Sequence, residues 1–211
     1  MTGSPPYVRV QLLAEGPYRR VYFGMDSVKS TFQTITDLEF QHLSDTKKRK
    51  LLQNLSFIIT RNLRHLNLAG YLGSSQNDAS LTIISEFMIG QCTLSSYIKQ
   101  HVKFELTLGS SIIRQILEGL AYLNENGLSM GSLNTTDIWI DVKGRVKLSN
   151  YGLFETTFQS VQTLCDRADI MALGGIVLEM FNGFPSENSP DNELAILDPL
   201  ALSFVKECLS T

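Results

Sequence analysis

The stretch from Tyr122 to Gly152 constrains the fold of this chain more than any other part of it. A helix is expected to end at Asn126-Gly127, because a glycine readily takes the left-handed conformation that closes helices. A loop follows, and then two short apolar runs, Ile138 to Ile140 and Val146 to Leu148, separated by a tight turn with Lys143-Gly144. The stretch therefore predicts a helix, a loop, a strand, a turn and a second strand, in that order.

Composition argues against several classes of protein. The chain has 211 residues, 43% hydrophobic and 18% charged, which suits one globular domain or two small lobes. The formal net charge of -3 argues against nucleic acid or a membrane surface as a partner. Three unpatterned cysteines favour a reducing compartment, which predicts a cytoplasmic protein. Residues 1–6 are expected to be disordered or to derive from a cloning vector.

Apolar alternation and helical spacing predict the remaining elements. Ahead of the central stretch they predict a hairpin over Val8 to Phe23, strands over Phe32 to Leu38 and Leu81 to Phe87, and helices over Leu94 to Gln100 and Leu106 to Asn124. Ser44-Asp45 is expected to cap another helix, with a buried stripe of Leu51, Leu55, Ile58, Ile59 and Leu63. The inward face of the helix over 106–124 is predicted as Ile112, Ile113, Ile116, Leu117, Leu120 and Leu123. Two further helices are expected, one from Asp166 and one over Leu194 to Leu209.

The central stretch resembles the catalytic loop of protein kinases, written H-R-D-L-x-x-x-N, and the metal-binding D-F-G that follows it. Those places hold Met130-Gly131-Ser132, then Asn134 for the loop lysine and Asp137 for the loop asparagine, and finally Asn150-Tyr151-Gly152. Downstream, Asp169 resembles the aspartate that holds the backbone of the catalytic loop. The resemblance implies structural roles for Met130, Tyr151, Gly152 and Asp169.

The first half of the chain resembles the same family more weakly. Ala14, Gly16 and Arg19 stand in the three glycine places of the nucleotide loop. The strand that carries the phosphate-binding lysine in kinases holds no lysine here and contains Thr34. Ser56 stands in the place of the glutamate that pairs with that lysine.

The resemblance implies an α+β, bilobal kinase-like fold. A small N-lobe is expected over residues 7–88, with antiparallel strands and one helix. A larger, mainly helical C-lobe is expected over residues 89–211, short at its C-terminal end and with a shortened activation segment.

Phosphoryl transfer needs a carboxylate beside the acceptor hydroxyl, an anionic oxygen ligand for Mg²⁺ and a cation on the phosphates. Ser132, Asn150 and Thr34 supply none of these. The sequence therefore predicts a pseudokinase, which is not an enzyme and binds no cofactor or metal. The alternative is a weak, unorthodox ATP-binding kinase in which Asp137 holds one Mg²⁺.

Two kinase groups share further features with the chain. Tyr71-Leu-Gly-Ser-Ser75 and the run from Val146 to Gly152 resemble the MAP kinase kinase kinase group. The strand without lysine, the basic helix start and the short activation segment are more similar to the pseudokinase domain of the general-control, amino-acid-starvation kinase, which phosphorylates the alpha subunit of translation initiation factor 2.

The second likeness implies allosteric activation of an adjacent kinase domain of the same polypeptide, in the translational response to amino-acid starvation. The candidate partner contacts are Lys47, Lys48, Arg49 and Lys50, and a homodimer is a further arrangement. The alternative is a free-standing scaffold that docks a component of a MAP kinase cascade.

Overall fold

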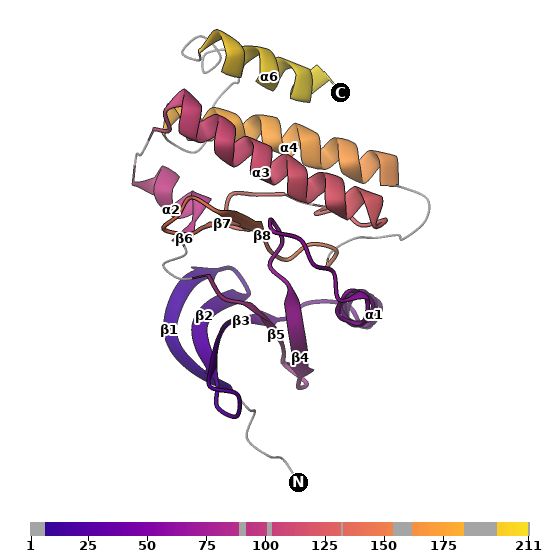
Figure 1. The fold of residues 1–211 in the computed structure, drawn as a ribbon. Coiled ribbons are helices and arrows are strands. Elements are labelled where there is room, and N and C mark those ends of the chain that lie inside the picture. Colours follow the sequence, from indigo (N-terminus) through magenta and orange to yellow (C-terminus); the bar gives the residue numbers. More distant parts are fainter. Residues whose placement is uncertain are drawn as a thin grey trace. The chain divides into compact units, whose positions relative to one another are not determined.

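The computed structural model describes residues 7–88, 92–100, 103–131, 133–153, 162–183 and 198–210. The chain forms two compact units (Figure 1). Unit 1 comprises Met1–Arg64 and Ala69–Ile89, and unit 2 comprises His65–Leu68 and Gly90–Thr211. The short segment 65–68 thus belongs to the second unit, although unit 1 surrounds it in the sequence. Residues 1–6 lie outside the described residues, so the expectation for them is not compared with the structure. The same holds for the shortened activation segment, because residues 154–161 within it are not described.

Unit 1 is an antiparallel sheet with one helix. Its elements are β1 (Tyr7–Gly16), β2 (Arg19–Asp26), β3 (Thr31–Glu39), α1 (Asp45–Arg61), β4 (Tyr71–Gln76) and β5 (Ser80–Glu86). The strand order is β1-β2-β3-β5-β4, and every neighbouring pair is antiparallel. This is the small strand-rich half that the resemblance implied.

Helix α1 begins where the sequence predicted. The Ser44 hydroxyl accepts a hydrogen bond from the Lys47 backbone N–H at 3.4 Å, and Asn62 closes the helix with a φ of 49°. Leu51, Leu55 and Ile58 are buried, as expected. The predicted stripe overlooked Asn54, which is buried, and it included Ile59, which is only half-buried.

Unit 2 is mainly helical and carries a small three-stranded sheet. Its elements are β6 (Cys92–Thr93), α2 (Leu94–Lys99), α3 (Leu106–Glu125), β7 (Ile138–Ile140), β8 (Val146–Leu148), α4 (Gln162–Asn182) and α6 (Pro199–Ser210). The strands are antiparallel in the order β6-β7-β8. The two units together confirm the α+β class. None of the helices within the described residues has the length and apolar character of a transmembrane span.

Helix α3 is the core helix of unit 2. Ile112, Ile116 and Leu123 on it are at most 1% exposed. Gly119 allows close packing, because a Cβ there would lie 2.9 Å from Leu148 Cδ1 and 3.2 Å from the Asn67 carbonyl oxygen. The sequence could not show this need for a glycine.

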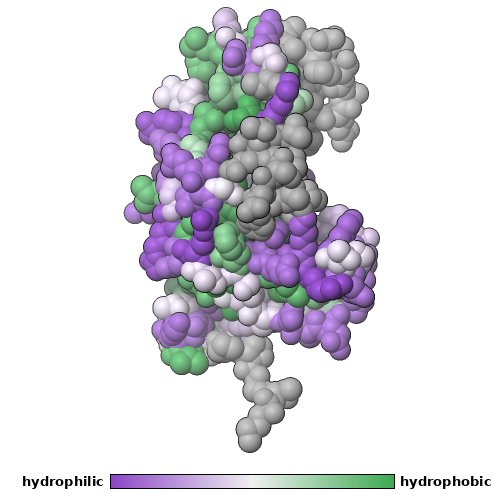
Figure 2. All heavy atoms as spheres, turned by 90° about the vertical axis from the view of Figure 1, so that its right-hand side faces the viewer, coloured by the Kyte–Doolittle hydropathy of each residue, from purple (hydrophilic) through white to green (hydrophobic). Residues whose placement is uncertain are grey.

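The predicted inward face of α3 was too wide, because Leu117 and Leu120 are only half-buried. Leu117 lines an apolar hollow of about 270 Å³ between α3, α4 and α6, which Val177 and Phe204 also line. Leu200, which also lines the hollow, is 71% exposed. In Figure 2, hydrophobic side chains are exposed at the helical end of unit 2.

The turn between β7 and β8 is held by a buried carboxylate. Asp141 is 2% exposed and accepts hydrogen bonds from the backbone N–H groups of Lys143 and Arg145, both at 2.9 Å, and from Arg145 Nε at 2.6 Å. Burial alone would raise the pKa of Asp141. The hydrogen bonds from the Arg145 backbone and guanidinium outweigh burial, so its pKa lies below the ordinary value of 3.8.

This pKa gives a testable pH dependence for Asp141→Asn. Since the pKa is lower in the folded state, the carboxylate stabilises the fold above pH 3.8, and this contribution disappears as the pH falls through the folded value. We expect the variant to lose about 1–2 kcal/mol of unfolding free energy at pH 7. The difference from wild type should shrink below about pH 4, as measured by urea unfolding across pH. A difference that stays constant down to pH 2 would contradict this account.

Candidate functional site

The site is built on the short hairpin of β7 and β8. Asp137 precedes β7 and Asn150 lies two residues after β8, and the antiparallel pairing of Ile138 with Leu148 brings these ends of the hairpin together. The Asn150 Nδ2 donates a hydrogen bond to Asp137 Oδ1 at 2.7 Å. Asp137 is 5% exposed. Asp137 stands in the place of the loop asparagine of kinases and Asn150 in the place of the D-F-G aspartate, and the two side chains are in direct contact.

Asn134 approaches Asp137 from the other side. Its Nδ2 donates a hydrogen bond to Asp137 Oδ2 at 2.6 Å. Its Oδ1 accepts hydrogen bonds from the Thr136 backbone N–H, at 2.9 Å, and from the Thr136 hydroxyl. Both Asp137 oxygens thus accept a hydrogen bond from a neutral carboxamide, and this arrangement fixes the direction of the carboxylate without neutralising its charge.

Asn150 itself is held in an unusual backbone conformation. Its φ is 60°, in the left-handed region that asparagine tolerates better than most residues. Next to it, Gly152 has a φ of 68° and donates its backbone N–H to the Ser129 carbonyl oxygen at 3.0 Å, while the Tyr151 side chain is fully buried. The Asn150-Tyr151-Gly152 turn is therefore anchored to the loop that precedes β7.

Asp169 on α4 organises the same loop. Its Oδ2 accepts hydrogen bonds from the backbone N–H groups of Met130, at 2.8 Å, and Gly131, at 3.4 Å, and its Oδ1 accepts one from Leu133 at 3.4 Å. Asp169 is 3% exposed. The loop that contains Asn134 is thus tied to α4 by one buried carboxylate. Ser132 lies within this loop but outside the described residues.

Unit 1 contains two further residues that stand in places of the kinase motifs, Thr34 and Ser56. Thr34 on β3 is 5% exposed, and its hydroxyl donates a hydrogen bond to the Glu86 carbonyl oxygen at 3.1 Å. Its neutral side chain supplies no positive charge to a phosphate. Ser56 is exposed on α1, and its carbonyl oxygen accepts a hydrogen bond from the Thr60 hydroxyl at 2.8 Å.

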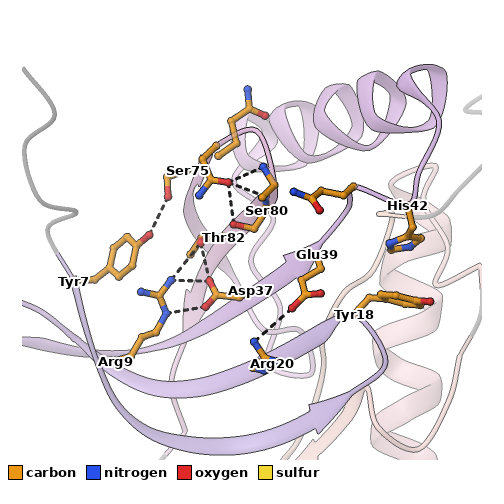
Figure 3. A pocket seen from close by; sticks show the side chains of 14 residues that line it. Tyr7, Arg9, Tyr18, Arg20, Asp37, Glu39, His42, Ser75, Ser80 and Thr82 are labelled. Carbon is orange, nitrogen blue, oxygen red and sulfur yellow. Dashed lines mark hydrogen bonds and ion pairs between the residues drawn. The ribbon is translucent and has the colours of Figure 1, made fainter.

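Unit 1 also has a polar hollow of about 850 Å³ over its sheet (Figure 3). Arg9 makes a two-pronged ion pair with Asp37, with Nε–Oδ2 at 2.7 Å and Nη2–Oδ1 at 2.8 Å, and the hydrogen bond to Asp37 raises the pKa of Arg9. Arg20 Nη1 lies 3.4 Å from a Glu39 carboxylate oxygen. Both arginines that line the hollow thus face carboxylates, so neither is an uncompensated cation for a phosphate.

The candidate partner surface lies at the start of α1. Lys47 and Arg49 are exposed, and Lys50 is half-buried. Lys48 Nζ lies 3.8 Å from Asp45 Oδ1 and 5.7 Å from the centre of the Phe40 ring. A contact with a partner at this surface stays a prediction.

Ser149 and Trp139 were not among the predicted site residues. Trp139 Nε1 donates a hydrogen bond to the Ser149 hydroxyl at 3.1 Å, and the Ser149 backbone N–H donates one to the Asp137 carbonyl oxygen at 2.9 Å. The available signal was the position of Ser149 directly before Asn150 and the presence of a single tryptophan in the chain. Neither feature shows by itself that the two side chains meet.

The sequence pattern of the protein kinase domain matches residues 7–168. Similar proteins include the mitogen-activated protein kinase kinase kinase mkh1 of Cytospora mali, 29% identical over 95% of this chain and 13% of that protein. The mitogen-activated protein kinase kinase kinase MCK1 of Pyricularia oryzae is 26% identical over 95% of this chain and 16% of its own length. The mitogen-activated protein kinase kinase kinase A of Dictyostelium discoideum is 28% identical over 92% of this chain and 23% of its own length. The chain thus spans less than a quarter of each relative.

These comparisons correct the sequence analysis on one point. The prediction that the chain is not an enzyme is wrong, because a protein kinase domain and three proteins named as kinases match it over most of its length. That prediction gave full weight to a few motif positions, whereas the family match extends over residues 7–168. The relatives come from one of the two groups named above, and they give no support to the likeness to the general-control kinase. Since the match covers residues 7–168 of 211, the chain belongs to the protein kinase domain family.

Proposed function

We propose that this chain is a kinase domain of the MAP kinase kinase kinase group that binds Mg²⁺ and ATP and phosphorylates the next kinase of a MAP kinase cascade. The observation that carries the proposal is the contact between Asp137 and Asn150 at 2.7 Å. The family pattern has an asparagine and then an aspartate in these places. Because the two side chains are neighbours, exchanging them leaves one carboxylate and one carboxamide at the same spot.

The donor set fits Mg²⁺. This ion prefers oxygen ligands and is usually bound by one or two carboxylates together with substrate phosphates. Asp137 offers a carboxylate, and no hydrogen-bond donor among the described residues reaches Asn150 Oδ1, the far end of the carboxamide whose Nδ2 contacts Asp137. The described residues contain no cluster of three or more His, Cys, Asp or Glu side chains for a metal. The ion would therefore depend on the nucleotide for most of its ligands.

The residues around the pair have distinct tasks. Asp137 and Asn150 would hold Mg²⁺, which when bound neutralises the charge that develops on the phosphate oxygens. Asn134 keeps the Asp137 carboxylate in one direction, and Asp169 keeps the loop that carries Asn134 in place. The strand that carries the phosphate-binding lysine in the family holds Thr34 and no lysine here, so we infer that charge neutralisation depends mainly on the ion. We expect turnover well below the roughly 1–100 s⁻¹ of ordinary kinases.

The proposal is tested by exchanging the two residues. The double variant Asp137→Asn/Asn150→Asp restores the family order and keeps one carboxylate, so it should retain the rise in melting temperature caused by Mg²⁺ and ATP. The single change Asn150→Asp creates two adjacent carboxylates and should make that rise depend more steeply on Mg²⁺ concentration. Transfer of labelled γ-phosphate to a MAP kinase kinase is measured in parallel. If wild-type protein shows neither a melting shift nor transfer, the proposal is wrong.

A second candidate is docking to a component of the same cascade, a role that does not depend on the transfer step. Thr34 favours docking, because the strand that carries the phosphate-binding lysine in kinases holds this neutral residue instead. Its hydroxyl donates a hydrogen bond to the Glu86 carbonyl oxygen. Capture of a purified MAP kinase kinase by this chain separates the two candidates. Binding that persists without ATP, and that weakens when Lys47, Lys48, Arg49 and Lys50 are all changed to Glu, would support docking through the start of α1.

A further inference from the structure

The Ser149 hydroxyl lies at the centre of a small hydrogen-bond network that contacts both Asp137 and Asn150. It donates to the Asp137 carbonyl oxygen at 3.2 Å and accepts from Trp139 Nε1 at 3.1 Å and from Asn150 Nδ2 at 3.4 Å. A serine hydroxyl has one donor and two acceptor positions, so these contacts use all of them.

The chemistry of the partners fixes the direction of each hydrogen bond. An indole nitrogen and a carboxamide nitrogen can only donate, so the single hydroxyl proton of Ser149 must go to the Asp137 carbonyl oxygen. Asn150 Nδ2 then has one hydrogen for Ser149 and one for Asp137 Oδ1. Its carboxamide is held at the nitrogen end, which leaves Oδ1 as the end directed to a ligand.

Trp139 is the outer member of this network. It is the single tryptophan of the chain, it is 5% exposed, and it lies in β7, where Lys147 of β8 is its pairing partner. The packed ring therefore keeps Nε1 in a fixed place. Among the described contacts of Trp139, the hydrogen bond to Ser149 is the one that leads to the Asp137–Asn150 pair.

We propose that Trp139 is a positioning residue for the Asp137–Asn150 pair and acts through the Ser149 hydroxyl. The inference rests on the proposed function, which names Mg²⁺ with ATP as the ligand of the pair. By occupying one acceptor position of Ser149, the indole N–H restricts the hydroxyl to the orientation that holds Asn150. Residues that orient ligand side chains from behind typically change metal affinity by about 10–100-fold when they are removed.

The first test needs no nucleotide. The side-chain amide signals of Asn150 in a ¹H–¹⁵N NMR spectrum are identified by their loss in Asn150→Asp. We expect Trp139→Phe and Ser149→Ala each to shift these signals and to speed their exchange with water, while Ser149→Thr, which keeps the hydroxyl, leaves them near wild type. In the Ser149→Ala background, adding Trp139→Phe should cause no further change.

The controls separate positioning from general destabilisation. Ile140→Val removes one methylene from the same buried strand and should leave the Asn150 signals unchanged. If Trp139→Phe does not fold, benzothienylalanine can replace the single tryptophan, since it keeps the ring shape and lacks the N–H group. The inference is wrong if a folded protein that lacks the indole N–H gives the same Asn150 signals as wild type. It is also wrong if Trp139→Phe has its full effect in the Ser149→Ala background.

The second test measures affinity for ATP with Mg²⁺ by calorimetry. Trp139→Phe should weaken it about tenfold, and Ile140→Val should leave it unchanged. Equal affinities of Trp139→Phe and wild type would overturn the positioning role. If the wild-type protein binds no nucleotide, the proposed function fails, and the NMR comparison still decides whether Trp139 orients the pair.

Discussion

Asp137→Asn is expected to abolish the rise in melting temperature that Mg²⁺ and ATP cause and to lower phosphate transfer by about 100-fold or more. Asparagine has nearly the same shape as aspartate but no negative charge. The pair would then consist of two carboxamides, and a hard cation would have no anionic ligand from this site. Melting curves with and without Mg²⁺ and ATP measure the first effect, and transfer of labelled phosphate measures the second.

Asp141→Asn is the matched control for this change. Asp137 and Asp141 are both buried carboxylates, one directly before β7 and one directly after it. Asp141 is committed to the turn and to Arg145, away from the pair. Its replacement should lower stability but leave the response to Mg²⁺ and ATP intact. A normal melting response in Asp137→Asn would show that Asp137 is not the metal ligand.

Asp169→Ala is expected to cost the largest amount of stability among these changes. It removes the acceptor of three backbone N–H groups, of which those of Met130 and Leu133 are buried. An unsatisfied buried donor costs about 1–3 kcal/mol, so we expect a loss of about 3–5 kcal/mol. For a chain of this length the melting temperature should fall by roughly 6–20 °C. Urea and thermal unfolding measure both quantities.

Two further variants serve as controls for the stability loss expected in Asp169→Ala. Asp169→Asn keeps one acceptor oxygen and should lose less stability than the alanine variant. Glu118→Gln removes a charge that is half exposed on α3 and pairs with Arg114 at 3.6 Å, so it should change stability by less than about 0.5 kcal/mol. A loss below 1 kcal/mol in Asp169→Ala would mean that water replaces the carboxylate and that the loop does not depend on it.

Most elements of the fold could be predicted because their signals are local. The apolar spacing over 106–124 predicted α3, and Ser44 predicted the start of α1, since a helix period and a capping hydroxyl depend on neighbours within a few residues. The errors fall where packing decides. Asn54 is buried although it is polar, and Leu117 is only half-buried although it fits the stripe, because it faces the hollow between α3, α4 and α6.

The candidate site divides in the same way. The residue types at 134, 137 and 150 could be read from the motif frame, but the prediction of inactivity treated each replacement separately. Asp137 and Asn150 are 13 residues apart in sequence, and only the pairing of β7 with β8 brings their side chains to 2.7 Å. The link from Trp139 through Ser149 to Asn150 is equally invisible in a list of residues.

The sequence by itself determined most of the helices and strands, although it did not predict β4 and β6, and it supplied the side chains around Asp137. Periodicity, capping and composition are properties of the chain alone. Only the tertiary structure decided that one carboxylate at 137 and one carboxamide at 150 share a single place, and that Asp169 holds a loop 39 residues away. The physical reason is that a hydrogen bond between distant residues exists only once strand pairing and helix packing have brought donor and acceptor within about 3 Å.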